Sequence, residues 1–277
     1  MKKRKPWRIV LLLVLLGIVL AGGVWLRWMK SADTSNKWNA SCVGNIPAPI
    51  GYKRVPAQAG DYTTFLRALP LKPKGSKVQL YTGGEANYQW LSTAVVNMPL
   101  LSNAEQCADV TMRLRAEYLY KTGRYSDIRF TDVNHRTMQY QGGKSRANFE
   151  LFLKKVYDVC NTFSLYHETE PRPIQEVQPG DVLVYPARNG HQYGHAIRVV
   201  DVAKNKAGKV AIMCVEGNTP ARDIHIVRNA THPFQNPWFL LDGNDRGIRV
   251  SVFHFEPEEL RHYQTKKATS RVAFIIS

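Results

Sequence analysis

The fold prediction starts from the segment Pro179-Gly-Asp-Val-Leu-Val-Tyr-Pro-Ala-Arg-Asn-Gly-His-Gln-Tyr-Gly-His-Ala-Ile-Arg-Val-Val-Asp-Val-Ala203. It holds two short β-rich runs, Val182 to Tyr185 and Ala196 to Val202, which a loop connects. The Pro-Gly pair before the first run is a turn signal, and valine, isoleucine and tyrosine are enriched in strands. The stretch therefore predicts two neighbouring strands, with His195 at the start of the second.

His195 is a candidate general base, because histidine titrates near neutral pH and this one stands where a loop enters a strand. Gly194 leaves room for backbone or substrate beside the imidazole. The alternative is a structural histidine at the end of a strand, whose ring N–H donates a hydrogen bond to a backbone carbonyl. His191 competes for the role, but a loop holds a fixed hydrogen bond poorly. Ile197 and Val199 share the sheet face of His195, so we expect them to pack on the helix that carries the nucleophile.

The amino terminus combines a basic cluster, Lys2 to Lys5, with an uncharged run from Ile9 to Leu26. That run is long enough to suggest a membrane-spanning helix, and the positive-inside rule places the basic end in the cytosol. We therefore expect a bacterial inner-membrane protein with a periplasmic domain. Secretion after signal cleavage near Ala21-Gly-Gly23 is the alternative. The predicted organisation is a cytosolic segment 1–8, a transmembrane anchor 9–29, a tether and entry segment 30–59, and an extracytoplasmic α+β domain 60–277.

The formal net charge of +16 on 277 residues is partly a property of the amino terminus. Residues 31–277 carry 31 basic against 22 acidic side chains, a balance of about +9 that proximity to anionic lipid or cell-wall polymer explains. No basic helix, stacking platform or zinc-finger spacing accompanies the charge, which argues against nucleic-acid binding. The motifs C-x-x-C and H-E-x-x-H are absent, so we expect no metal site and no cofactor.

The clearest predicted helix runs from Leu101 to Tyr120. Cys107, Val110 and Leu114 recur in it at spacings of three and four, which gives one apolar stripe. Cys107 falls near the amino end of this helix. We expect the charged residues of the same helix to face solvent: Arg113, Arg115 and Glu117.

Three interpretations of the role of Cys107 are open. The partial positive charge at a helix amino terminus favours a thiolate, which makes this cysteine a candidate nucleophile. A small buried hydrophobic residue is the ordinary alternative for a free cysteine. A third reading is a structural disulfide to Cys160 or Cys214, which an extracytoplasmic compartment permits.

The remaining periodicity predicts two further helices and several strands around the central pair. The helices are expected at 62–69 and 148–161, and the strands at 77–81, 92–98, 129–133, 210–215, 224–227, 238–239 and 250–255. Strands that outnumber helices and follow one another along the chain predict an α+β domain with a mostly antiparallel sheet.

The order of these motifs resembles the NlpC and CHAP branches of the papain-like cysteine hydrolases. The resemblance rests on a helix-start cysteine, on Pro179-Gly-Asp-Val182 with Gly194-His-Ala-Ile197, and on a strand that ends in a polar residue. It implies a papain-like helix packed on a mostly antiparallel sheet. It also implies that Cys107 is the nucleophile, His195 the base, and Glu216 or Asn218 the residue that orients the imidazole.

A second resemblance covers roughly residues 47 to 262 and is closer. The segments that carry it include Phe65-Leu-Arg-Ala-Leu-Pro-Leu-Lys-Pro73, Gln106-Cys-Ala-Asp109 and Pro220-Ala-Arg-Asp-Ile-His-Ile226. They are similar to an uncharacterised bacterial envelope family, domain of unknown function 4846.

Together these observations predict a membrane-anchored cysteine amidase or peptidase that acts on cell-wall peptides. The expected partners are the inner membrane, through the amino-terminal helix, and peptidoglycan. The alternative is a non-catalytic envelope binding or structural protein that keeps the fold without the chemistry.

Overall fold

The computed structural model describes residues 6–30, 36–188, 193–241 and 247–263. The α-helices there are α1 (Pro6–Lys30), α2 (Tyr62–Arg67), α3 (Cys107–Lys121), α4 (Arg146–Val159) and α5 (Thr162–Glu168). The strands are β1 (Tyr52–Arg54), β2 (Ser92–Val95), β3 (Arg129–Thr131), β4 (Thr137–Gln139), β5 (Thr169–Pro171), β6 (Val182–Tyr185), β7 (His195–Asn205), β8 (Val210–Glu216), β9 (His225–Val227), β10 (Trp238–Leu241), β11 (Ile248–Val250), β12 (Phe253–Phe255) and β13 (Leu260–Tyr263).

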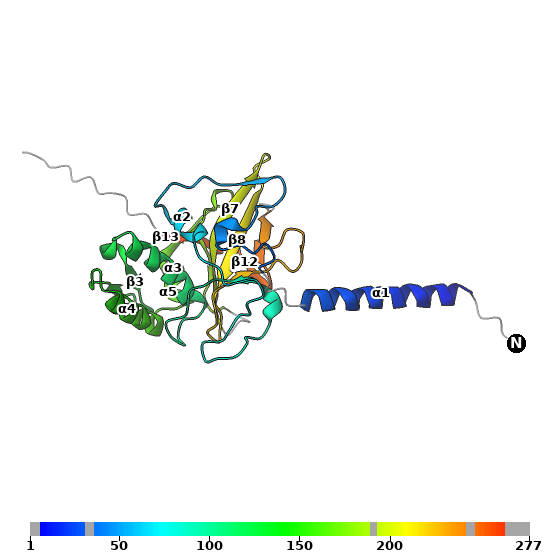
Figure 1. Ribbon diagram of the computed structural model, residues 1–277, viewed down its shortest axis with the longest axis horizontal. Coiled ribbons are helices and arrows are strands. Elements are labelled where there is room, and N and C mark those ends of the chain that lie inside the picture. Colours follow the sequence, from blue (N-terminus) through cyan, green and yellow to red (C-terminus); the bar gives the residue numbers. More distant parts are fainter. Residues whose placement is uncertain (1–5, 31–35, 189–192, 242–246, 264–277) are drawn as a thin grey trace, which may run out of the picture.

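One large antiparallel sheet forms the body of the molecule. Its strand order is β2-β9-β8-β7-β6-β13-β5, with β1 paired to β7 and β10 paired to β8. The predicted strand pair is β6 and β7, in which Tyr185 lies opposite His195. Figure 1 shows the long β7 and β8 hairpin at the centre, α3, α4 and α5 gathered on one side of it, and α1 extending away.

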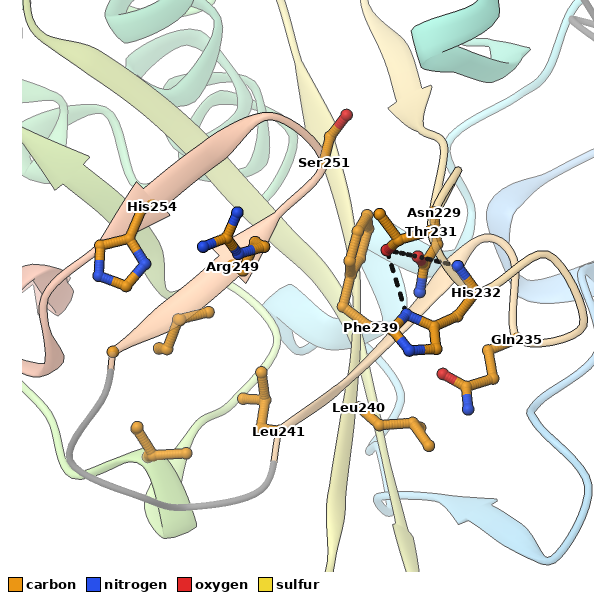
Figure 2. Close-up of a pocket in the computed structure, with 13 residues that line it drawn as sticks. Asn229, Thr231, His232, Gln235, Phe239, Leu240, Leu241, Arg249, Ser251 and His254 are labelled. Carbon is orange, nitrogen blue, oxygen red and sulfur yellow. Dashed lines mark hydrogen bonds between the residues drawn. The ribbon is translucent and has the colours of Figure 1, made fainter. Parts of the chain in front are cut away.

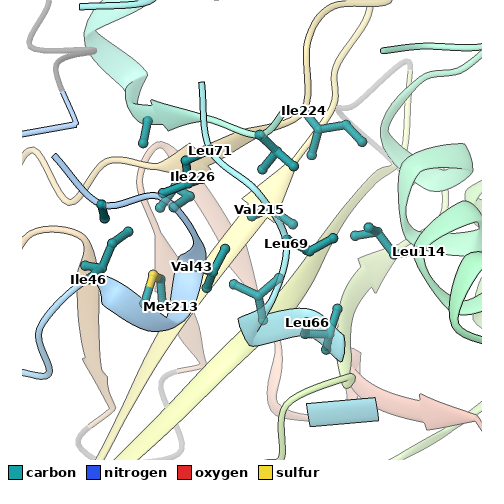
Figure 3. Close-up of a cluster of buried hydrophobic side chains, with 14 of the residues drawn as sticks. Val43, Ile46, Leu66, Leu69, Leu71, Leu114, Met213, Val215, Ile224 and Ile226 are labelled. Atoms are coloured by element: carbon teal, nitrogen blue, oxygen red, sulfur yellow. The ribbon is translucent and has the colours of Figure 1, made fainter. Parts of the chain in front are cut away.

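A buried apolar cluster joins α2 and α3 to the sheet (Figure 3). Leu66 and Leu69, from α2 and the turn after it, lie in this cluster with Leu114 of α3 and Val215 of β8. The predicted tether contributes to the same cluster, because Val43 is fully buried there. Burial of each such side chain stabilises the fold by about 1.5–3 kcal/mol, so this cluster fixes α3 against β7 and β8.

The papain-like part of the fold prediction is wrong. The mostly antiparallel sheet is present as expected, but it is a large, nine-stranded sheet with few helices and not the papain-like arrangement of a helix packed on a sheet. Short strands that the sequence pattern did not predict widen it, such as β1 on β7 and β13 between β6 and β5. These strands have three or four residues, too few for an alternation of apolar and polar side chains to be recognised.

The transmembrane anchor is also contradicted. The run that suggested it does form a helix, α1, from Pro6 to Lys30. Within the described residues, however, the structure contains no helix that combines the length and the apolar character needed to cross a membrane.

The charged side chains of α3 are not the solvent-exposed face that we expected. Arg113 is 3% exposed and donates from Nη1 to Glu105 Oε1 at 2.8 Å, while its Nε lies 3.3 Å from Glu117 Oε1. Glu105 also accepts from the backbone N–H of Leu101 at 2.7 Å. This contact holds residues 101–105 in a turn, which explains why the helix begins at Cys107 rather than at the predicted Leu101.

Candidate functional site

Cys107 is the first residue of α3, where the positive end of the helix dipole favours a thiolate. The backbone N–H of Gln106 donates to Asp109 Oδ2 at 2.9 Å, which caps the helix. Burial raises the pKa of Asp109 to about 8, so its carboxyl group is largely neutral at pH 7 and does not repel a neighbouring thiolate. The position of Cys107 is therefore suited to a nucleophile.

Gly217 explains how the start of α3 comes so close to the end of β8. A Cβ atom at this position would lie 2.6 Å from Val110 Cγ2 and 3.3 Å from the backbone oxygen of Gln106. In addition, Thr219 Oγ1 donates to Gln106 Oε1 at 2.8 Å. The segment that follows Glu216 is thus packed directly against the turn that carries Cys107.

His195 opens β7, and its imidazole lies close enough to the Cys107 side chain for the thiol to affect its pKa. Gly194 allows this approach, since a Cβ atom there would collide with Thr162 Oγ1 and with the backbone oxygen of Tyr185. The imidazole is 5% exposed and Cys107 is 8% exposed, so the pair lies almost entirely inside the protein.

The packing that we expected to bring His195 to α3 is not the packing found. Ile197 and Val199 belong to an apolar cluster on the sheet face away from α3. The opposite face meets the helix, where Arg198 Nη2 donates to the backbone oxygen of Thr111 at 2.6 Å. His195 lies at the end of β7, opposite Tyr185, and its imidazole contacts Glu216 at the end of β8, next to the start of α3.

Glu216, the last residue of β8, is the third member of the group. Its Oε2 lies 2.9 Å from His195 Nε2, and its Oε1 lies 3.3 Å from His225 Nε2. His225 lies directly opposite Glu216 on β9, and its Nδ1 is 3.0 Å from the backbone oxygen of Asp223. Since Glu216 occupies Nε2 of His195, Nδ1 is the nitrogen left for Cys107.

The electrostatics of the group favour an ion pair. Burial alone would lower the pKa of His195, but hydrogen bonds to Cys107 and Glu216 outweigh it and raise the pKa to about 9. Burial alone would raise the pKa of Glu216, but hydrogen bonds from His195 and His225 hold it at about 2. A charged imidazolium that a buried carboxylate stabilises, next to a cysteine side chain, is the arrangement that activates a cysteine nucleophile.

Phe253 of β12 covers the imidazole. The ring centroids of Phe253 and His195 are 3.8 Å apart, with an angle of 18° between the ring planes. An aromatic face attracts a cation and excludes water from it. This contact fixes the ring orientation and strengthens its hydrogen bonds to Cys107 and Glu216.

The other predicted site residues lie elsewhere. Asn218 is half-buried and its Oδ1 accepts from the backbone N–H of Thr219 at 2.8 Å, so Glu216 rather than Asn218 contacts the imidazole. His191 lies outside the described residues. Over the described ranges, no group of three or more histidine, cysteine or acidic side chains is arranged to hold a metal ion.

All four cysteines are free thiols, so the disulfide reading of Cys107 finds no bond to Cys160 or Cys214. Burial raises the pKa of Cys160 to about 12 and raises that of Cys214 further. Both are packed in apolar clusters away from an imidazole. Cys107 is therefore distinguished from them by its histidine.

Sequence reasoning missed His225 and Phe253. His225 lies in the run 224–227 that was predicted as a strand, but its place beside Glu216 depends on the register between β8 and β9, which the sequence does not show. Phe253 gave no signal, because its contact depends on how the β11 and β12 hairpin folds over β7.

A separate cavity of about 480 Å³ lies on the other side of that hairpin (Figure 2). Arg249 and His254 border it from the hairpin, and Thr231 Oγ1 contacts Asn229 Oδ1 and His232 Nδ1, each at 3.1 Å, across from them. Successive strand residues point to opposite faces, so Phe253 faces His195 while His254 faces the cavity. Cys107 and His195 do not line it.

The family described as "Domain of unknown function (4846)" matches the chain over residues 43–143 and 137–262. No curated protein and no solved structure matches it. The expected family of unknown function is therefore found, whereas the resemblance to NlpC and CHAP hydrolases has no support.

Proposed function

We propose that this chain, which belongs to the family of domain of unknown function 4846, is a cysteine hydrolase that cleaves an amide bond with Cys107 as nucleophile. The observation that carries the proposal is the continuous chain of contacts from Cys107 through His195 to Glu216. A helix-start thiol, a histidine and a carboxylate that orients it are the parts that nucleophilic catalysis needs.

The chemistry proceeds in two steps. The Cys107 thiolate attacks the amide carbonyl carbon, the carbon–nitrogen bond breaks, and the His195 imidazolium gives its proton to the leaving amine. The neutral His195 then takes a proton from water, whose oxygen attacks the thioester. The carbon–sulfur bond breaks, which releases the carboxylic acid and restores the Cys107 thiolate beside the His195 imidazolium. Glu216 holds the ring and stabilises its charged form throughout.

The oxyanion of each tetrahedral intermediate needs hydrogen-bond donors. The first N–H groups of an α-helix have no acceptor within the helix. The backbone N–H groups of Cys107 and Ala108 belong to this first turn of α3. We assign them the role of stabilising the oxyanion, because preformed backbone donors in a site shielded from water act strongly on developing charge.

Cell-wall peptides are the substrates that we propose, with the domain acting outside the cytoplasm. This part rests on the sequence, in which a basic cluster precedes an apolar run as in an export signal. The positive balance of residues 31–277 is compatible with an anionic wall polymer.

The test is digestion of purified cell wall by the full-length protein, with mass spectrometry of the released peptides. The Cys107→Ala and His195→Ala variants are expected to release no fragments, while Cys42→Ala, the matched cysteine control, keeps full activity, as does His191→Ala. Circular dichroism checks that each variant folds. Equal release by the wild-type and Cys107→Ala proteins contradicts the nucleophile assignment.

A non-catalytic envelope protein is the second candidate, and the enclosure of the site favours it. Cys107 and His195 are 8% and 5% exposed, and Phe253 lies over the imidazole. In that case the wild-type protein binds cell wall without cleaving it, and Cys107→Ala binds equally well. The same digestion assay, with a pull-down of intact cell wall beside it, separates the two functions.

A further inference from the structure

A cavity of about 490 Å³ lies between α2, α3, the turn before β6 and the end of β13. The volume is that of a small-molecule site. Tyr62, Arg115, Tyr118 and Tyr263 line it. Arg115 follows Cys107 by eight residues of the same helix, which is about 12 Å along the helix axis. The cavity is therefore separate from the candidate nucleophile.

The walls of this cavity carry hydrogen-bonding atoms that the protein leaves unused. The hydroxyls of Tyr62 and Tyr263 and Nη1 of Arg115 are fully buried and have no hydrogen-bond partner among the described residues. A buried polar atom without a partner destabilises the folded protein, so a ligand that pairs with these atoms is favoured. Tyr118 differs, because its hydroxyl donates to the backbone oxygen of Gly60 at 3.2 Å.

Packing holds these groups in place. A Cβ atom on Gly180 would lie 2.7 Å from Tyr62 Cδ1, and the Tyr62 and Tyr118 ring centroids are 4.9 Å apart. The guanidinium carbon of Arg115 lies 4.3 Å from the centroid of the Tyr263 ring. The free donors are thus carried on side chains that neighbouring rings and backbone orient before any ligand arrives.

Among the residues that the structure describes, no carboxylate forms an ion pair with Arg115. Asp127 pairs with Arg124 at 2.8 Å, and Asp181 pairs with Arg172 at 3.0 Å. The third acidic residue of the lining, Asp61, accepts from the backbone N–H groups of Thr64 and Gln58 at 2.6 and 2.8 Å.

Glu168 is close enough to influence Arg115 and Tyr263 electrostatically. Burial raises the pKa of Glu168 to about 7, so it is only partly ionised at neutral pH. The negative charge of Glu168 also acts on Arg129, so it is shared between two guanidinium groups. The cavity therefore retains a positive charge that Glu168 offsets incompletely.

We propose that this cavity binds a small organic carboxylate, whose oxygens accept from Arg115 Nη1 and from the hydroxyls of Tyr62 and Tyr263. A carboxylate has two acceptor oxygens with about four lone-pair sites, which suit one guanidinium N–H and two hydroxyl donors. The neighbouring rings of Tyr62 and Tyr118 offer an apolar wall, so the ligand carries an aromatic or aliphatic body beside its carboxylate.

The experiment titrates the full-length protein with benzoate, benzamide and inorganic phosphate by isothermal calorimetry. Benzoate is expected to bind, with benzamide and phosphate at least about tenfold weaker, because neither supplies a singly charged planar acceptor. Tyr62→Phe and Tyr263→Phe are each expected to weaken benzoate about tenfold, the loss of one hydrogen bond to a charged group.

Tyr118→Phe is the matched control, since it removes a hydroxyl from the same wall that is already bonded to Gly60. Its affinity for benzoate is expected to stay within about twofold of wild type. Cys107→Ala should also bind benzoate normally, which separates this site from the proposed catalytic one. Absence of benzoate binding, unchanged affinity in both Tyr62→Phe and Tyr263→Phe, or tighter binding of phosphate overturns the proposal.

Discussion

Replacing Glu216 by glutamine tests the electrostatic core of the candidate site without changing its shape. The glutamine oxygen can still accept from His195, but the buried negative charge is gone. Glu216 is 1% exposed and contacts both His195 and His225, so solvent does not screen the loss. The substitution therefore removes the charge interaction and little else.

The size of the effect follows from the two pKa shifts, which describe one shared interaction and are not added. The pKa of Glu216 falls from 4.5 to about 2, a shift that corresponds to about 3 kcal/mol of stability. This contribution is present above about pH 4.5 and is lost as the pH falls towards 2. The pKa of His195 rises from 6.5 to about 9, so its contribution is present below 6.5 and is lost as the pH rises through 9.

Urea unfolding of wild-type and Glu216→Gln proteins between pH 2 and pH 10 measures this directly. The difference in the free energy of unfolding should be largest, about 3 kcal/mol, between pH 4.5 and 6.5, and should shrink towards both ends. A difference that stays constant from pH 3 to pH 9 refutes the reasoning, because a purely steric effect does not titrate.

Two further predictions concern the scaffold of the site. Arg113→Met should lower the free energy of unfolding by about 3–5 kcal/mol, because it leaves the Glu105 carboxylate buried without its partner. The control is Arg124→Met, which removes a largely exposed ion pair and should cost below about 1 kcal/mol. Urea unfolding compares the two variants, and an equal loss of unfolding free energy in both would contradict this prediction. Gly194→Ala should cost about 1–3 kcal/mol and abolish hydrolysis, because the new methyl group meets the backbone oxygen of Tyr185 and displaces the start of β7. Unchanged stability and activity in this variant would show that the close approach is not needed.

The parts of the fold that the sequence predicted are those with a strong local signal. β6 and β7 follow a Pro-Gly turn and are rich in β-branched residues, and the apolar stripe of α3 repeats over several turns. Such patterns depend on neighbours in the chain, so one sequence is enough to read them. The run 77–81 looked similar, yet only isolated bridges form there, from Gln79 to Glu85 and from Leu80 to Arg222.

The candidate site was only partly predictable, because sequence patterns report on neighbours in the chain and not on contacts between distant segments. The residue types and their places at a helix start and at strand ends were available for Cys107, His195 and Glu216. The choice between Glu216 and Asn218 depends on which side chain points at the imidazole. His225 and the buried position of Arg113 depend on contacts between distant segments, which no local pattern contains.

The assignment of Cys107 as an activated nucleophile can be tested by its rate of alkylation. Iodoacetamide is added at pH 6, and peptide mass spectrometry follows the modification of each cysteine. Cys42 is a partly exposed free thiol whose Sγ donates to Asn45 Oδ1, and it serves as the internal reference. An imidazolium-stabilised thiolate predicts that Cys107 reacts faster than Cys42 although it is more buried, and that His195→Ala removes the advantage. Modification of Cys107 no faster than that of Cys42, or a fast rate that survives in His195→Ala, would contradict the account.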